Sequence, residues 1–240
     1  MKQYLAGKIR NVALAGHSSS GKTTLAEALL FKSGYSDRLG RVADGNTVCD
    51  FDPEEIRRKG SVSSTVAPFA WGSTKINLID TPGLFDFEGG MYEGVIAAES
   101  VLITVSARDG VEVGTEKAYQ LADRLGRAKM FFVTQMDMDN ADFYKVLEQL
   151  KSDFGPSVCP LVVPFMADGK VQCYINLVDN KAYKYDGGAI SETEMPDTGH
   201  RLEGLIAAMS EAIAETDEAL MEKFFSGEQF TRDEILHGIH

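Results

Sequence analysis

Residues 16–23 read GHSSSGKT, and four of them fit the spacing G-x-x-x-x-G-K-[ST]. The two glycines allow a turn so tight that several backbone N–H groups can face one phosphate. Lys22 adds a positive charge for the outer phosphates, and the hydroxyl of Thr23 can ligate Mg²⁺. A Gly/Ser turn that merely joins a strand to a helix is the alternative, but it does not require this spacing. The stretch therefore predicts a nucleotide-binding loop formed by Gly16, His17, Ser18, Ser19, Ser20, Gly21, Lys22, Thr23 and Thr24.

A second candidate stretch, LIDTPG, covers residues 78–83. Its apolar start reads as a buried strand, which carries Asp80 to its carboxyl end before a Pro-Gly turn. A carboxylate there can hold Mg²⁺ through water, and the Gly83 N–H can contact a γ-phosphate. Alone, D-x-P-G is typical of a simple turn. Here Asp80 lies 57 residues after Thr23 of the phosphate loop, and the combination of the two motifs favours a P-loop NTPase over a simple turn.

These residues need a scaffold that brings them to one edge of a sheet. Short apolar runs predict strands at 11–16, 65–71, 75–80, 101–107 and 129–135. Apolar positions that recur every three or four residues predict helices at 22–33, 90–99, 113–126 and 139–152. The alternation indicates an α/β fold whose mostly parallel sheet is covered by helices on both faces. Ligands of such sheets bind beyond the carboxyl ends of the strands, where both motifs fall.

The pattern changes after residue 153, and we predict a core of residues 1–153 followed by a small α+β unit of residues 154–240. The later strands are predicted at 160–165, 171–179 and 181–187. Residues 195–225 have a helical pattern in which Pro196 is an early helix residue, and Thr231 with Glu234 predicts a capped last helix at 231–239. Residues 35–64 show little regular pattern, which is typical of a functional or mobile loop.

Composition limits the classes of partner. The net charge is −12 and the pI about 4.8, so the field of the protein repels nucleic-acid phosphates, and we expect no direct DNA binding. No apolar run reaches the roughly 18 residues of a membrane span, and the N-terminus lacks an export signal. The three cysteines are widely spaced. Free thiols and a cytoplasmic location are therefore expected.

The motifs and their neighbours resemble a translational GTPase, most closely elongation factor G and its bacterial relatives. NVALAGHSSSGKTTLAEALL resembles the first strand, loop and helix of that family. EEIRRKGSVSSTVAPFAW resembles the end of its switch I, and NLIDTPGLFDFEGGMYEGVIAAES begins the region that resembles its switch II. INLVDNKAYKY and ALMEKFFSGEQFTRDEI resemble the subdomain that elongation factor G inserts within its G domain.

The resemblance implies roles for individual residues. The loop from Gly16 to Thr23 would hold the phosphates of GTP or GDP, Thr23 and Asp80 would serve Mg²⁺, and Gly83 would contact the γ-phosphate. Lys22, Gly83 and the residue at position 84 are the implied catalytic positions.

Ser61 stands where the family has the threonine that ligates Mg²⁺ in the GTP state. Serine keeps the hydroxyl, so the role can survive. A solvated loop serine is the alternative, because that loop is polar.

Leu84 is the most consequential departure from the family, which has a histidine here that positions the attacking water. Leucine has no hydrogen-bonding group, and phosphoryl transfer depends on positioning, so hydrolysis is expected to be slow. His17 lies in the phosphate loop, and we interpret it as a loop-surface histidine that does not substitute.

The guanine-reading motif NKxD is present as TQMD, from Thr134 to Asp137. Asp137 can accept hydrogen bonds from guanine that adenine does not offer. Thr134 lacks the amide that links the base to the phosphate loop, and Gln135 is shorter than lysine for covering the base. Guanine preference with weaker affinity is expected; the alternative is that Asp137 merely caps the helix predicted at 139–152.

The family's second guanine loop, a Ser-Ala pair after a final strand, has no counterpart in this sequence. We therefore expect a piece of a longer factor that lacks the last strand and helix of the G domain. Residues 129–135 would then form an apolar sheet edge that could pair with another copy of the chain.

We accordingly predict a GTP-binding domain that requires Mg²⁺ and that reaches the ribosome through its parent protein. A nucleotide-sensing switch with little hydrolysis and an ATPase are the alternatives.

Overall fold

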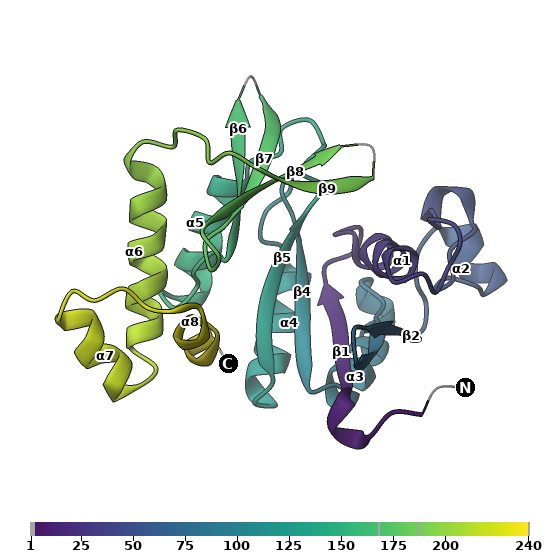
Figure 1. The fold of residues 1–240 in the computed structure, drawn as a ribbon. Helices are drawn as coiled ribbons and strands as arrows, with labels where there is room; N and C mark the ends of the chain where they lie inside the picture. Colours follow the sequence, from purple (N-terminus) through teal and green to yellow (C-terminus); the bar gives the residue numbers. More distant parts are fainter. Residues whose placement is uncertain (1–2, 168, 187, 240) are drawn as a thin grey trace. The chain divides into compact units, whose positions relative to one another are not determined.

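The computed structural model describes residues 3–167, 169–186 and 188–239. They divide into two compact units, residues 1–135 (unit 1) and residues 136–240 (unit 2), which are labelled by element in Figure 1. The boundary expected between residues 153 and 154 stays a prediction. It would fall within the last turn of helix α5 (Phe143–Phe154), which belongs to unit 2. Within the described residues, no helix combines the length and the apolar character that crossing a membrane requires.

Unit 1 contains a five-stranded sheet with the order β2-β3-β1-β4-β5. β1 pairs in parallel with β3 and β4, β4 pairs in parallel with β5, and only the pairing of β2 with β3 is antiparallel among the described strands of this sheet. The mostly parallel sheet expected from the sequence is confirmed. The strands are β1 (Ile9–Gly16), β2 (Thr65–Trp71), β3 (Thr74–Asp80), β4 (Ser100–Ser106) and β5 (Ala128–Thr134).

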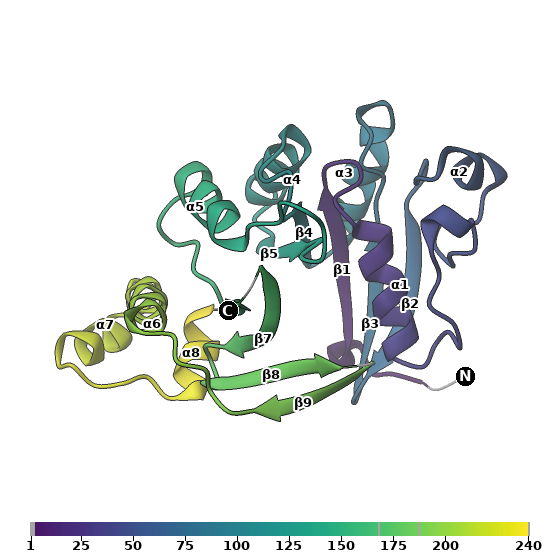
Figure 2. The same cartoon turned by 90° about the horizontal axis from the view of Figure 1, so that it is seen from above.

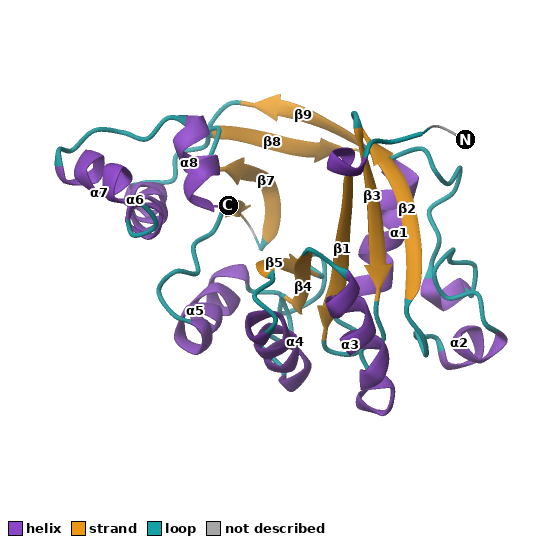
Figure 3. Cartoon of the chain, turned by 90° about the horizontal axis from the view of Figure 1, so that it is seen from below, coloured by secondary structure: helices purple, strands orange, loops and turns teal. Residues whose placement is uncertain are grey.

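Helices cover both faces of this sheet, as Figures 2 and 3 show. Alternate residues of β1 point to opposite faces. Ala13 and Ala15 join a core with α3 (Glu88–Ala97) and α4 (Val113–Arg124), whereas Leu14 joins a core with α1 (Lys22–Lys32). The helices thereby hold the carboxyl ends of β1 and β3, from which the two sequence motifs emerge.

The segment 35–64 is more regular than its sequence indicates. It contains the helix α2 (Pro53–Arg58), which opens with a capping box between Asp52 and Glu55. Two buried glutamates fix the segment: Glu27 Oε1 accepts from the backbone N–H of Val48 and Cys49, and Glu55 Oε1 accepts from the N–H of Val62 and Ser63. Unit 1 also has the 3₁₀ helices η1 (Ala6–Lys8), η2 (Val42–Asp44) and η3 (Phe85–Phe87).

Unit 2 is an antiparallel sheet with helices packed on its apolar side chains. The strands follow the order β6-β7-β8-β9, and all described pairings are antiparallel. Ile175 and Ala182 from the sheet share one core with Met209, Leu220 and Ile235 from three helices. The remaining elements are β6 (Val162–Ala167), β7 (Lys170–Asn176), β8 (Lys181–Asp186), β9 (Ala189–Thr193), α6 (His200–Ala214), α7 (Glu218–Phe225) and α8 (Arg232–Ile239).

The helical pattern predicted for residues 195–225 resolves into two helices. α6 begins at His200, so Pro196 lies outside it, because Gly199 before the helix adopts φ 54°. The chain leaves the helix after Ala214, and Asp217 caps α7 by accepting from Ala219 and Leu220 N–H. Residue 187 of the strand predicted at 181–187 lies outside the described residues.

The cap predicted for the last helix is confirmed. The Thr231 N–H donates to Glu234 Oε2 at 2.6 Å, and the Glu234 N–H points back to Thr231 Oγ1 at 3.4 Å.

Candidate nucleotide-binding site

The loop between β1 and α1 depends on glycine at both ends. Gly16 has φ 136° and Gly21 has φ 88°, a backbone region that other residues rarely adopt. A Cβ at Gly16 would lie 2.6 Å from the carbonyl oxygen of Thr104, so that position has no room for a side chain. Ser20 fastens the loop from within, because its Oγ donates to His17 O at 2.8 Å and contacts Thr104 Oγ1 at 2.6 Å.

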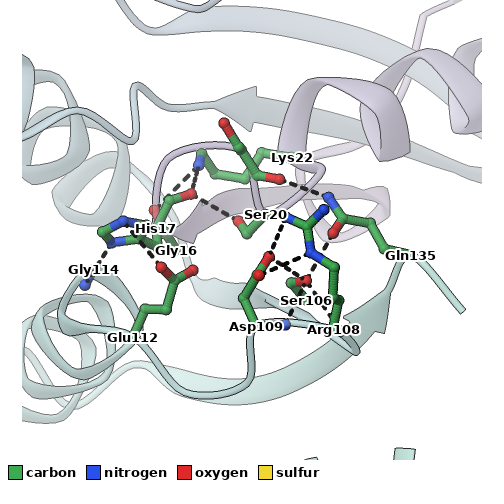
Figure 4. Close-up of polar contacts among 11 residues, drawn as sticks. Gly16, His17, Ser20, Lys22, Ser106, Arg108, Asp109, Glu112, Gly114 and Gln135 are labelled. Atoms are coloured by element: carbon green, nitrogen blue, oxygen red, sulfur yellow. Dashed lines mark hydrogen bonds and ion pairs between the residues drawn. The ribbon is translucent and has the colours of Figure 1, made fainter. Parts of the chain in front are cut away.

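Lys22 lies buried at the start of α1. Its Nζ donates to the carbonyl oxygens of His17 at 2.6 Å and Gly16 at 3.1 Å, so the ammonium sits inside the curve of the loop (Figure 4). Burial lowers the pKa of Lys22 to about 8, against the opposing effect of Asp80 and other carboxylates. A buried cation encircled by backbone is suited to an anionic ligand.

Asp80 is buried at the carboxyl end of β3, next to Thr23. Thr23 Oγ1 donates to Asp80 Oδ2 at 2.7 Å, whereas Asp80 Oδ1 has no partner among the described residues. Burial raises the pKa of Asp80 to about 7, although the Thr23 hydrogen bond and Lys22 lower it. The predicted proximity of Asp80 to the phosphate loop is therefore observed.

Asp50 is a site residue that the sequence motifs missed. It is buried, Ser61 Oγ donates to its Oδ1 at 2.7 Å, and its Oδ2 has no partner in the described structure. Burial raises its pKa above the ordinary range. Ser61 also lies 3.2 Å from Thr23 Oγ1, so it is not the solvated loop serine of the alternative interpretation.

The two hydroxyls and two carboxylates form a site that fits a divalent cation. Each hydroxyl has one proton, and Thr23 and Ser61 direct theirs to Asp80 and Asp50. Their mutual 3.2 Å contact then brings lone pairs together, and two buried carboxylate oxygens remain unpartnered among the described residues. Hydroxyl and carboxylate oxygens are ligands that Mg²⁺ prefers, and phosphate oxygens of a nucleotide commonly complete such a set. The site has two carboxylates, so it differs from a metal centre built from three or more His, Cys, Asp or Glu side chains, and the described part of the chain contains no cluster of that kind.

A cavity of about 400 Å³ opens beside the loop within unit 1. Ten of the predicted site residues line it: Ser18, Ser19, Gly21, Lys22, Thr23, Thr24, Ser61, Gly83, Leu84 and Gln135. Arg58 and Lys59 line it as well, and neither was predicted as a site residue, although the basic run before Ser61 was a signal for them. Asp80 is bonded to Thr23, which lines the cavity. The carbonyls of Gly16 and His17 accept from Lys22, and the hydroxyls of Ser20 and Thr134 hold the loop in place.

The turn after Asp80 passes directly over the phosphate loop. A Cβ on Gly83 would lie 2.5 Å from Lys22 Nζ and 2.8 Å from Ser18, so only glycine allows this approach. Leu84 follows with 39% of its surface exposed and lines the cavity without a polar group. Its neighbour Phe85 is held between the ring of His17, with centroids 5.6 Å apart, and Lys117 Nζ, 4.8 Å from the ring centroid.

His17, interpreted from the sequence as a loop-surface histidine, has a side chain that is 24% exposed and has contacts at both ring nitrogens. Its Nδ1 accepts from the N–H of Gly114 at 3.2 Å, which places the proton of the neutral ring on Nε2. Nε2 lies 3.3 Å from Glu112 Oε1 (Figure 4). Both ring nitrogens of His17 are thus engaged by unit 1 itself, and its interpretation as a residue that does not substitute for the family's histidine stays a prediction.

The TQMD residues are divided between the units. Thr134 and Gln135 end β5 and reach the phosphate loop: Thr134 Oγ1 donates to Ser20 O and Gln135 Nε2 to Ser19 O, both at 2.7 Å. Asp137 belongs to unit 2, and its guanine-reading role stays a prediction. It does not cap α5, because that helix begins at Phe143 and Asp142 is its N-cap.

The parallel sheet, the glycine-bounded loop and the buried lysine together define a P-loop nucleotide-binding protein. The sequence profile of the elongation factor Tu GTP-binding domain family matches residues 7–232. The chain belongs to this family, and the resemblance to translational GTPases is confirmed.

Individual relatives agree with the family assignment. An elongation factor G-like protein from Thermotoga maritima is 37% identical over 228 residues, which is 95% of this chain and 32% of that protein. One from Mycobacterium tuberculosis is 36% identical over 236 residues, 97% of this chain and 32% of that protein. A crystal structure from Thermus thermophilus matches with a TM-score of 0.90 and 40% identity, over 97% of this chain and 35% of that one. The chain thus spans about a third of the length of these relatives.

Proposed function

We propose that the cavity of unit 1 binds GTP and GDP together with Mg²⁺, and that GTP is hydrolysed there slowly to GDP and phosphate. The observation that carries the proposal is the position of Lys22: a buried ammonium inside a glycine-bounded loop, next to a hydroxyl that is bonded to a buried carboxylate. That arrangement is costly to bury and suits a polyphosphate with its metal.

Each residue has a role that follows from its placement. Lys22 and the loop N–H groups bind the outer phosphates, and α1 directs the positive end of its dipole at them. Gly83 brings its N–H to the γ-phosphate. Thr23, Ser61 and Asp80 hold Mg²⁺, with Asp50 next to them. When bound, Mg²⁺ would neutralise charge on the phosphate oxygens.

Leu84 favours a second candidate function, a nucleotide-sensing switch with little turnover. The leucine lines the cavity but can neither accept nor donate a proton, and both nitrogens of His17 are engaged elsewhere. In either case the γ-phosphate would order residues 50–64 and 80–90, which hydrolysis would release. Glu27 and Glu55 limit how much of the first segment can move.

Single-turnover GTP hydrolysis, with and without ribosomes, separates the two candidates. If the protein is a slow GTPase, Leu84→His accelerates hydrolysis and the wild type shows a measurable rate on the ribosome. Leu39→His, at an exposed leucine of the same unit, is the matched control and leaves the rate unchanged. A wild-type rate equal to the uncatalysed rate in both conditions would favour the switch, and an unchanged rate in Leu84→His would contradict the role given to position 84.

The ribosome as partner and the cytoplasm as location are also proposals, based on the elongation factor G-like relatives, of whose length this chain spans about a third. Pairing of β5 with another copy is also a proposal: β5 is last in the strand order, and Met130 and Phe132 on it are 47% and 43% exposed. Sedimentation of the chain at increasing concentration tests it.

A further inference from the structure

We propose that Thr134 and Gln135 are positioning residues for the phosphate loop, and that the Gln135 amide acts on the loop rather than on the nucleotide base. The inference rests on the proposed function and deepens it. It concerns which part of the nucleotide loses affinity when the end of β5 is altered.

Thr134 fixes the direction of one loop peptide. Its Oγ1 donates to Ser20 O at 2.7 Å, and its side chain lies 3.4 Å from the position that a Cβ on Gly21 would take. The C=O and N–H of a trans peptide point in opposite directions. When Thr134 holds the carbonyl of Ser20, the N–H of Gly21 must therefore point away from Thr134.

Gln135 holds the preceding peptide. Its Nε2 donates to Ser19 O at 2.7 Å, and Ser19 has φ 63°, a left-handed conformation that is strained for a residue with a side chain. Gln135 itself has φ 58°. Two strained residues facing each other persist only where contacts hold them in place. The Gln135–Ser19 hydrogen bond is such a contact, and it links them directly.

Ser106 sets the orientation of the Gln135 amide. Its Oγ lies 2.7 Å from Gln135 Oε1 and 2.9 Å from Asp109 Oδ2, and its single proton can serve one of them at a time. The amide oxygen of Gln135 can only accept, so its 2.7 Å contact needs that proton, whereas Asp109 keeps two hydrogen bonds from Arg108, at 2.9 Å each, without it (Figure 4). Both ends of the amide are then committed: the oxygen to Ser106 and the nitrogen to the loop.

A committed amide predicts an effect on phosphate binding and not on base binding. Gln135→Met keeps the length and the apolar stem that could cover a base, but loses both hydrogen bonds. Thr134→Val keeps the shape of the side chain and loses the hydroxyl. The affinities of GMP and GDP for each variant separate the two roles, since GDP adds the β-phosphate that the loop would hold.

Calorimetric titration of the full chain with GMP and with GDP, in excess Mg²⁺, is the test. Each variant loses one hydrogen bond to the phosphate loop, so each should weaken GDP about tenfold and GMP less than about twofold. Gln120→Ala, at an exposed glutamine on α4, is the control and changes neither. Thermal unfolding of each variant verifies that it is folded at the titration temperature.

Two results would overturn the inference. Equal loss of GMP and GDP affinity in Gln135→Met and Thr134→Val would mean that these residues act on the base or on the fold as a whole. No loss of either would mean that the loop keeps its shape without them. Failure of the wild type to bind GDP is a different outcome, because it would refute the proposed function itself.

Discussion

The two units bury different kinds of side chains. Among the described residues, the buried side chains of unit 2 are apolar, whereas unit 1 buries twelve polar or charged ones: Ser20, Lys22, Thr23, Glu27, Thr47, Asp50, Glu55, Asp80, Thr81, Thr104, Ser106 and Thr115. The net charge, by contrast, lies in unit 2. Residues 1–135 have 16 Lys and Arg against 16 Asp and Glu, and residues 136–240 have 8 against 20, so the net charge of −12 belongs entirely to unit 2.

This difference shows that unit 1, which contains the candidate site, buries polar groups that lower its stability. Burying a polar group costs free energy unless a hydrogen bond replaces its water. Unit 1 leaves three buried carboxylate oxygens unpartnered among the described residues, on Glu27, Asp50 and Asp80. Two of them adjoin Thr23 and Ser61, where the metal and the phosphates are proposed to bind. Unit 2 buries no polar side chain in its described core, and its stability comes from apolar packing.

Replacing Lys22 should have the largest effect on binding and none of that size on the fold. Lys22→Ala removes the buried cation of the cavity, so GDP affinity should fall by about two to three orders of magnitude. Lys32→Ala, at the exposed end of the same helix, is the matched control. Calorimetric titration measures both. A loss below about threefold in Lys22→Ala would contradict the phosphate site.

Truncating a core side chain of unit 2 should lower stability and leave nucleotide binding unchanged. Ile175 is 1% exposed on β7, so Ile175→Ala should lower the free energy of unfolding by about 2–5 kcal/mol. Ile190→Ala, 66% exposed on β9, should change it by less than about 0.5 kcal/mol. Urea unfolding gives these values. GDP affinity at a temperature where the variant is folded should be unchanged, and a loss as large as that of Lys22→Ala would erase the distinction between the units.

Asp50→Asn tests what a buried carboxylate of unit 1 costs in stability and contributes to Mg²⁺ binding. It removes a buried negative charge that raises the pKa of Asp80, so the nucleotide-free protein should gain about 1 kcal/mol of unfolding free energy. GDP affinity should depend less on Mg²⁺ than in the wild type. Asp37→Asn, in the exposed part of the same segment, is the control. Lower stability with unchanged Mg²⁺ dependence would show that Asp50 is purely structural.

The smallest effect is expected at the ion pair of α8. Lys223 Nζ donates to both oxygens of Glu234 at 2.8 and 2.9 Å, and this bond, with the Thr231 hydrogen bonds, lowers the pKa of Glu234 to about 2. The pKa of Glu234 in the folded protein lies below its ordinary value of 4.5. The ion pair therefore contributes fully to the free energy of unfolding above pH 4.5, and this contribution is lost as the pH falls toward 2.

Glu234→Gln should therefore lower the unfolding temperature slightly at pH 7, and the difference from the wild type should shrink as the pH falls below 4.5. Thermal unfolding between about pH 7 and about pH 3 measures it, with Glu222→Gln on the exposed side of α7 as the control. A difference that is constant with pH would rule out the ion pair as its source.

Local signals in the sequence predict most of the scaffold. The strand at 65–71 is observed with those bounds, and α1 begins at Lys22 as expected, because the alternation of strands, the glycines and the loop spacing lie within short windows. The start of α6 and the break before α7 were missed. There the φ of Gly199 and the cap at Asp217 decide where the helices begin, against an almost continuous helical periodicity.

The candidate site is less predictable where it depends on contacts across the chain. Asp50 has no motif around it. It is linked to Thr23 through Ser61, whose hydroxyl the fold of segment 35–64 brings to 3.2 Å from Thr23 Oγ1. The contacts of Thr134 and Gln135 with the phosphate loop were also missed. Comparison with the family's NKxD motif shows which groups Thr134 and Gln135 lack, but not which new hydrogen bonds they make. A hydroxyl can hold a loop carbonyl as an amide would, and only the structure places it there.

The proposed function requires the glycine-bounded loop of unit 1 to bind a guanine nucleotide together with Mg²⁺. Calorimetric titration of the wild-type chain with GDP and with ADP, each in Mg²⁺ and again in a chelator, tests it most directly. We expect one GDP bound per chain, much weaker binding of ADP, and a clear loss of GDP affinity when Mg²⁺ is removed. Equal affinities for GDP and ADP, or no binding of either, would contradict it.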